Sequence, residues 1–141
     1  MQNDLQKAIS LLKEENFTCV AVKGDALYTS CSRGVKPLLT LLQAGKTLEG
    51  YAAADKVVGK ATAFLYCLLG AAQVHALVIS RPALKVLEEN GIAASYDVLV
   101  DFIENRQKNG PCPMDYAVRD VVDAKDAPAA ILAALAKLQQ A

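Results

Sequence analysis

The sequence predicts one α/β domain over residues 1–141, built as a three-layer αβα sandwich in which helices cover both faces of a mixed sheet. Strand–helix–strand units in the second half of the chain predict parallel strands. A hairpin near the N-terminus predicts antiparallel strands in the same sheet. Apolar residues make up 53% of the 141 residues, which is enough to build one buried core.

The first half of the chain begins with an amphipathic helix, expected over residues 3–15, with its leucine and isoleucine side chains on one face. Two β-rich runs follow on either side of Gly24-Asp25, and this pattern predicts the hairpin. The next apolar run has a proline near its start and a glycine at its end. These residues predict a short helix from about residue 35 to residue 44.

A longer helix is expected in the centre of the chain, over residues 53–69. It is apolar nearly all round beyond Lys60, so both of its faces should be covered. Residues 74–80 form a continuous apolar run with β-branched side chains, which is typical of a central strand. The next helix is expected to open at Pro82 and to close at Gly91.

The last third of the chain is less regular. A strand is expected over residues 92–96. Residues 98–105 could extend that strand or form a helix, and we favour the helix. After a turn, residues 114–122 are expected to be helical. A final alanine-rich helix is expected to begin near Asp126, with leucine and isoleucine spaced to pack on the domain surface.

The composition limits the partners and the compartment. Fifteen basic and fifteen acidic residues give zero net charge, which argues against nucleic acid and against a polybasic membrane contact. Neutrality also allows self-association into a homo-oligomer. The longest nearly apolar run, residues 61–72, is shorter than the roughly 20 residues that span a membrane. The charged N-terminus does not resemble a signal peptide, and the four cysteines form no C-x-x-C pair, so we expect a cytoplasmic protein.

Polar side chains gather in the loops that join the predicted elements. The candidates for ligand binding are Ser30, Arg33, Asp55, Lys56, Lys60, Ser80, Arg81 and Arg106. In α/β sheets, ligands gather at the carboxyl ends of strands, and helix N-termini with nearby Lys or Arg favour an anionic small molecule. Each candidate also has an ordinary structural role. The serines and Asp55 are typical helix caps, and the lysines are typical of solvent-exposed faces.

Two further candidates lie near residue 112. Cys112 stands between two prolines just before a helix, where a thiol has a lowered pKa and raised reactivity. Cys112 is therefore a candidate nucleophile, with Asp115 assisting it. The alternative is a proline-rich turn around a buried cysteine. The single histidine, His75, is expected to pack in a core strand, because a lone histidine cannot build a multi-histidine metal site.

Residues 54–61 come close to a phosphate-binding P-loop. However, Ala54 replaces the first glycine of that motif, and Ala61 replaces its magnesium-binding hydroxyl. The segment also lies within the expected central helix rather than in a strand-to-helix loop. We therefore expect no triphosphate site of this kind, and no bound cofactor or metal.

Three stretches, residues 30–39, 54–63 and 105–115, together resemble an uncharacterised bacterial family of domains of unknown function with a cytidine deaminase-like fold. In that fold, as the resemblance implies, a long helix opens with H-x-E or C-x-E, and the helix after the next strand opens with P-C-x-x-C. The corresponding stretches here read Ala54-Asp55-Lys56 and Pro82-Ala83-Leu84-Lys85-Val86, in which only Asp55 could replace a ligand. The resemblance therefore implies this fold without zinc-dependent deaminase activity.

The sequence leaves three functions open. We expect first a small-ligand-binding domain for a nucleotide or another anionic metabolite. The alternatives are an enzyme that uses Cys112 as nucleophile, and a structural or interaction module that docks through its last helix. Whether the chain catalyses any reaction is not determined by the sequence.

Overall fold

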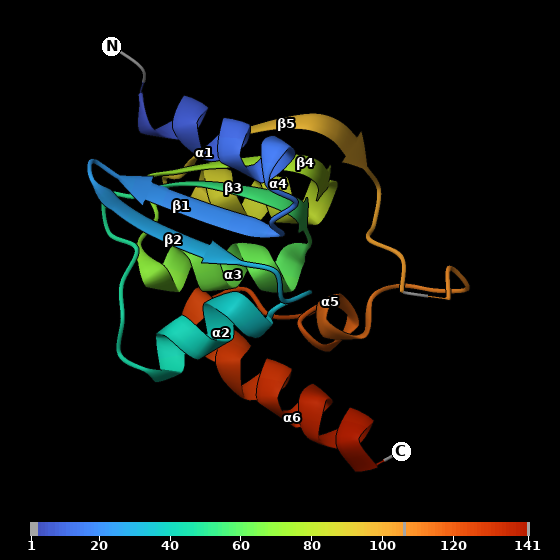
Figure 1. The fold of residues 1–141 in the computed structure, drawn as a ribbon. Coiled ribbons are helices and arrows are strands. Elements are labelled where there is room, and N and C mark those ends of the chain that lie inside the picture. Colours follow the sequence, from blue (N-terminus) through green and yellow to red (C-terminus); the bar gives the residue numbers. More distant parts are fainter. Residues whose placement is uncertain (1–2, 106, 141) are drawn as a thin grey trace.

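A computed structural model describes residues 3–105 and 107–140 as a five-stranded sheet covered by helices on both faces (Figure 1). In chain order, the elements are α1 (Asp4–Glu14), β1 (Cys19–Lys23), β2 (Ala26–Ser30), α2 (Lys36–Gln43), β3 (Ala52–Val58), α3 (Lys60–Leu69), β4 (Gln73–Ser80), α4 (Arg81–Glu89), β5 (Ala93–Val100), α5 (Pro113–Ala117), the 3₁₀ turn η1 (Ala124–Asp126) and α6 (Ala127–Gln140).

The sheet is mixed, as the sequence predicts. Its strand order is β2-β1-β3-β4-β5. β1 pairs antiparallel with both β2 and β3, whereas β3, β4 and β5 run parallel to one another. The predicted hairpin is β1–β2, with its turn at Gly24-Asp25. The parallel half of the sheet brings the carboxyl ends of three strands to one edge.

Two unequal layers of helices cover the sheet. On one face, α1 packs Ala8 and Leu12 against Val20 and Val22 of β1 and against Ala54 of β3. On the other face, α3 contacts both α2 and α4, and α6 lies outside α3 (Figure 1). The larger apolar core lies on this second face, so the elements that follow β2 contribute most of it.

The expected helix over residues 53–69 is wrong in its first part. Ala52–Val58 form β3, and α3 begins only at Lys60. Alanine favours helices, but pairing with β1 and β4 overrides that local preference. Alanine also suits this strand because β3 is buried on both faces, where small side chains let helices approach closely. Gly59, in extended conformation, joins the strand to the helix.

The expected helix over residues 98–105 is also wrong. Residues 98–100 continue the preceding strand, so β5 extends to Val100, and the residues after it form no helix. Val98 and Val100 pair with Val78 and Ser80 of β4, so β-branched side chains and a partner strand decide the conformation. The predicted helix over residues 114–122 forms only in part, because α5 ends at Ala117. The other predicted helices are confirmed within a residue or two of their ends.

Candidate functional site

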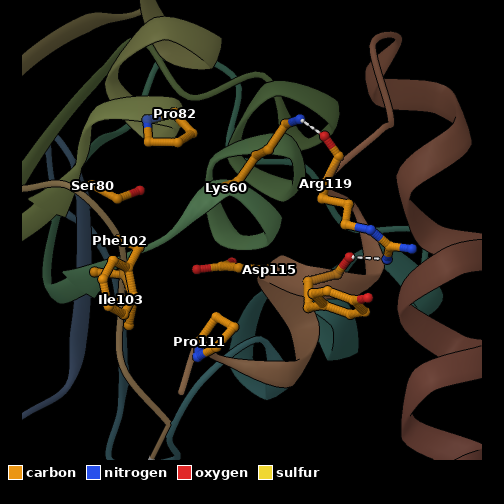
Figure 2. A pocket seen from close by; sticks show the side chains of 9 residues that line it. Lys60, Ser80, Pro82, Phe102, Ile103, Pro111, Asp115 and Arg119 are labelled. Atoms are coloured by element: carbon orange, nitrogen blue, oxygen red, sulfur yellow. Dashed lines mark hydrogen bonds between the residues drawn. The ribbon is translucent and has the colours of Figure 1, made fainter. Parts of the chain in front are cut away.

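A small open pocket lies at the carboxyl ends of the parallel strands (Figure 2). Its volume is about 270 Å³. The residues that line it are Lys60, Ser80, Pro82, Phe102, Ile103, Pro111, Asp115, Tyr116 and Arg119. They come from the end of β4, from the first residues of α3 and α4, from the segment after β5, and from α5 with the residues beside it. The topology therefore builds this pocket from segments that are far apart in the sequence.

Asp115 is the acidic residue of this pocket, and it closes the N-terminus of α3. Its Oδ1 accepts a hydrogen bond of 2.9 Å from the backbone N–H of Ala61. Gly59 makes this approach feasible, because a Cβ at that position would lie 2.0 Å from Oδ2 of Asp115. A carboxylate also suits the positive end of the helix dipole. The chain thus places its own anion where α3 would otherwise attract one.

Burial raises the pKa of the Asp115 carboxyl above its ordinary value, although the Ala61 N–H and the charge of Lys60 oppose that shift. The carboxylate points toward the middle of the pocket (Figure 2). A hydrogen-bond acceptor at this place suits a ligand that carries an N–H or O–H group. It disfavours a second anion in direct contact with the same helix end.

Two basic side chains border the pocket. The Nζ of Lys60 donates a 2.9 Å hydrogen bond to the backbone carbonyl of Arg119. The guanidinium of Arg119 lies 3.8 Å from the centre of the Tyr116 ring, in a cation–π contact. The Lys60 contact holds the segment after α5 beside the start of α3, and the cation–π contact joins that segment to α5.

A second open hollow adjoins the first and shares Lys60 and Pro82 with it. It has a volume of about 570 Å³ and contains three basic side chains, those of Lys60, Arg81 and Lys85. Arg81 forms an ion pair with Asp101 at 2.9 Å, and Glu89 also lines the hollow. The two hollows together provide an apolar wall beside a basic region.

The structure brings four of the predicted ligand-binding and catalytic candidates to these two hollows: Lys60, Ser80, Arg81 and Asp115. Ser80 has a second role, because its Oγ caps α4 by accepting the N–H of Ala83 at 3.3 Å. The sequence analysis named helix capping as the alternative to ligand binding for this serine, and the structure shows the cap.

Four other candidates lie elsewhere or outside the described residues. Ser30 ends β2, and Arg33 lies in the exposed loop before α2, and neither lines the two hollows. Lys56 donates to Asn16, in the loop that follows α1, at 3.3 Å. Arg106 lies outside the residues that the structure describes.

The sequence suggested that Asp55 caps a helix, and this expectation is wrong. Asp55 lies in β3 and packs under the middle of α3. Its Oδ2 accepts a 2.7 Å hydrogen bond from the Tyr66 hydroxyl, and that hydroxyl lies 3.3 Å from the Cys19 Sγ. Burial raises the pKa of Asp55 to about 7, against the opposing hydrogen bonds from Tyr66 and from the backbone N–H of Val57. This buried cluster does not line either hollow.

The pKa of the Cys112 thiol shifts in the opposite direction to the one that the sequence predicted. It precedes α5, as predicted, but burial raises the pKa of its thiol rather than lowering it. The backbone hydrogen bonds from Asp115 and Met114 oppose this rise, and the charge of Asp115 adds to it. A thiol in this environment is a weaker nucleophile at neutral pH than the sequence suggested.

Sequence reasoning did not select six residues of the pocket: Pro82, Phe102, Ile103, Pro111, Tyr116 and Arg119. Phe102 and Ile103 fall in the segment that was expected to be helical, so their place after the end of a strand could not be recognised. The exposed Phe102 and Tyr116 side chains offer the clearest signal, because large aromatic groups at the surface often mark a binding site.

Comparison with known proteins identifies a family. The family model for the domain of unknown function DUF1893 matches residues 7–134. A solved structure of a DUF1893 family protein from Thermotoga maritima is 30% identical in sequence, with a TM-score of 0.86 over 94% of this chain and 90% of that one. No curated protein matches the chain.

None of the described helices is long and apolar enough to cross a membrane.

Proposed function

We propose that this chain, which belongs to the DUF1893 family of domains of unknown function, binds a small anionic molecule such as a nucleotide at the carboxyl ends of β3, β4 and β5. The observation that carries the proposal is the pair of adjoining hollows. One has an apolar wall with an acceptor carboxylate, and the other contains three basic side chains and two acidic ones. Ligands of open α/β sheets gather at this edge.

The first hollow suits the uncharged part of such a ligand. Phe102, Ile103 and Tyr116 offer apolar and aromatic surface on which a planar ring can pack. The Asp115 carboxylate beside them can accept a hydrogen bond from a ring N–H or an amino group. A ring that offers a donor edge satisfies both features.

The second hollow suits the charged part. Asp115 already occupies the N-terminus of α3, so a phosphate would bind beside Lys60, Arg81 and Lys85 rather than at that helix end. Lys60 borders both hollows, and this position supports a role for it between the ring and the phosphate of such a ligand. Lys60 is therefore the residue whose removal should weaken binding most clearly.

The proposed fold class is cytidine deaminase-like, supported by the strand order β2-β1-β3-β4-β5 and by the pocket at the starts of α3 and α4. The helix openings differ from a zinc deaminase. α3 opens with Lys60-Ala61-Thr62 rather than at Ala54, and α4 opens with Arg81-Pro82-Ala83, so neither opening offers a His, Cys or Glu. The residues present do not suit a catalytic zinc ion, and we propose binding without zinc-dependent deamination.

The test uses AMP and CMP as probes, with adenosine, cytidine and inorganic phosphate for comparison, in thermal unfolding and calorimetric titration. A ligand at about 100 times its Kd stabilises the folded state by about 2.7 kcal/mol. We expect a nucleotide to stabilise the protein more than its nucleoside or phosphate does. No stabilisation by any of the five probes would overturn the proposal.

A matched pair of variants locates the site. Lys60→Ala is expected to weaken nucleotide binding about tenfold, because it removes one charged hydrogen bond to the phosphate. Lys56→Ala serves as the control, because Lys56 also makes one hydrogen bond but lies away from both hollows. Equal effects of the two substitutions would show that the ligand binds elsewhere.

A further inference from the structure

A second polar cluster lies in the sheet, away from the residues that line the two hollows. His75 of β4 stands directly opposite Ser95 of the neighbouring β5 in the strand register, and Asp97 follows two residues later on β5. The sequence predicts His75 as a core residue, and it is indeed buried, with 8% of its surface exposed. None of these three residues lines either of the two hollows, so the cluster is separate from the proposed nucleotide site.

Both ring nitrogens of His75 have partners. Nδ1 lies 2.7 Å from the hydroxyl of Ser95, and Nε2 lies 3.1 Å from Oδ1 of Asp97. An ionised carboxylate can only accept, so Nε2 must carry the hydrogen of that bond. In the neutral imidazole, Nδ1 is then an acceptor, and the Ser95 hydroxyl must donate to it. The three residues thus form a nucleophile, a base and an orienting carboxylate in one chain of hydrogen bonds.

Asp97 is an exposed carboxylate, and a lysine of α1 adds to the stability of its charge. Its Oδ2 lies 3.3 Å from the Nζ of Lys13, near the end of α1. Desolvation opposes the shift, but the hydrogen bond and charge of Lys13, followed by the hydrogen bond from His75, hold the pKa of Asp97 below its ordinary value. A charged Asp97 fixes the imidazole orientation and stabilises the imidazolium that forms when His75 takes a proton.

The surroundings of His75 favour a chemical role for it. The neighbouring position on β3 is Ala54, which packs with α1 in an apolar cluster. An aliphatic residue would satisfy such a place without hydrogen bonds, whereas a buried imidazole is costly unless both nitrogens are paired. Ser95 is only half-buried, and Asp97 is exposed, so the cluster opens to solvent at β5. Within the described part of the chain, β5 is an edge strand.

We propose that Ser95 is a nucleophile that reacts with small activated acyl esters. His75 acts as its base, and Asp97 orients the His75 imidazole. The Ser95 Oγ attacks the ester carbonyl carbon, and its proton passes to Nδ1 of His75. The tetrahedral intermediate collapses as the ester C–O bond breaks, and the leaving alkoxide takes the proton back from Nδ1. Water then hydrolyses the acyl-serine by the same proton transfers, which releases the acid and restores Ser95.

The first experiment measures covalent labelling of the full chain by a fluorophosphonate, which forms an Oγ–P bond and releases fluoride and the serine proton as HF. Peptide mapping compares Ser95 with Ser30, a half-buried strand serine whose hydroxyl accepts the Ser32 N–H rather than facing a base. We expect Ser95 to be labelled faster than Ser30, because only the Ser95 hydroxyl faces an imidazole nitrogen that can accept its proton. Labelling of Ser95 no faster than that of Ser30 would overturn the proposal.

The second experiment separates chemistry from packing, with p-nitrophenyl acetate hydrolysis as a further readout. His75→Gln is expected to slow both reactions at least about 100-fold, and Ser95→Ala to abolish the labelling at residue 95. Asp97→Asn should slow them about tenfold, since water weakens the effect of an exposed carboxylate. Lys13→Ala removes the tie to α1 but keeps all three residues, so it should change the rates less than about threefold.

Thermal unfolding of each variant accompanies these measurements, so that rates are compared only between folded proteins. A merely structural cluster would lose stability in Asp97→Asn and Lys13→Ala alike, while the labelling rate at Ser95 stayed the same. That result, or hydrolysis rates that Ser95→Ala leaves unchanged, would show that the hydroxyl is not a nucleophile. Loss of labelling in folded Ser95→Ala and His75→Gln, with Lys13→Ala unaffected, would support the proposal.

Discussion

Two carboxyl groups, those of Asp115 and Asp55, are buried against the same helix, α3. Different groups offset the cost of burying each of them. Asp115 lies at the N-terminus of α3, where a backbone N–H and the charge of Lys60 favour its ionised form. Asp55 lies under the middle of α3, with the Tyr66 hydroxyl and the backbone N–H groups of β3 as its partners. Among the described residues, Asp55 forms no ion pair.

The contrast shows which of the two carboxyl groups is placed to contact a ligand in its charged form. Burial raises the pKa of both carboxyl groups, but Asp115 faces a pocket and has a nearby cation that opposes the rise. Asp55 has an entirely buried setting, and its pKa rises to about 7. Asp115 is therefore suited to contact a ligand, whereas Asp55 links the protonation of the core to the stability of the fold.

The largest expected effect is a loss of stability with rising pH that depends on Asp55. Its folded-state pKa is raised to about 7 from an ordinary value of 3.8, so the folded state binds this proton more tightly than the unfolded state. The stabilisation is complete below about pH 4 and is lost as the pH rises to about 7. Three pKa units correspond to about 4 kcal/mol in the free energy of unfolding. Urea unfolding between these pH values measures it.

Asp55→Asn is the matched variant, because the amide is neutral and can still accept from Tyr66. It should remove most of this pH dependence and exceed the wild type in stability above about pH 7. If the variant and the wild type lost stability in parallel over this interval, Asp55 would not be the group that titrates, and the contrast with Asp115 would disappear.

The next effect concerns the space that Asp115 occupies. A Cβ at position 59 would lie 2.0 Å from the Asp115 carboxylate, so Gly59→Ala must displace that side chain from the N-terminus of α3. We expect a loss of about 2 kcal/mol in the free energy of unfolding, from the forced movement and the lost cap. Chemical denaturation measures it.

A double-mutant cycle supplies the control. In an Asp115→Ala background, Gly59→Ala should cost less than about 1 kcal/mol, because the side chain that it displaces is absent. Additive losses would mean that the alanine disturbs α3 directly and that the close approach of Asp115 is not the reason for glycine at this position.

A smaller effect separates the hydrogen bond of Asp115 from its charge. Asp115→Ala removes the cap on the Ala61 N–H and should cost about 1 kcal/mol. Asp115→Asn keeps an acceptor oxygen at the same place, so we expect a change below about 0.5 kcal/mol at neutral pH. Because burial raises the pKa of Asp115, the Asn variant should gain relative to the wild type as the pH rises. Equal losses in the two variants would show that charge dominates the capping interaction.

The sequence predicts much of this fold but only part of the site. The hairpin, β4 and α4 are recognisable because turn residues, apolar runs and helix caps agree locally. β3 was missed because an alanine-rich segment favours a helix until strand pairing is known. That error placed Asp55 at a helix end rather than in the core. Lys60, Ser80 and Asp115 were selected by local chemistry, whereas their meeting at one sheet edge depends on topology.

The same limit explains the cluster around His75. A lone histidine in an apolar strand gives no sign of its partners, because Ser95 and Asp97 lie on the next strand, about twenty residues later in the chain. Only the parallel register of β4 and β5 brings the three together. Residue type therefore indicates which side chains can take part in chemistry, and strand pairing decides which of them lie within hydrogen-bond distance of one another.

The smallest expected effect tests whether Lys60 distinguishes the two carboxylates. Lys60→Met keeps an unbranched side chain but removes the charge that lowers the pKa of Asp115, so that pKa should rise further. The pKa of Asp55 should stay the same, because its shift comes from burial and hydrogen bonds within the core. Carboxyl-carbon NMR titration measures both groups, and stability should change by no more than about 0.5 kcal/mol because water screens the lysine. Lys56→Met is the control, and an equal response of Asp115 to either substitution would mean that overall charge, rather than the pocket lysine, sets its pKa.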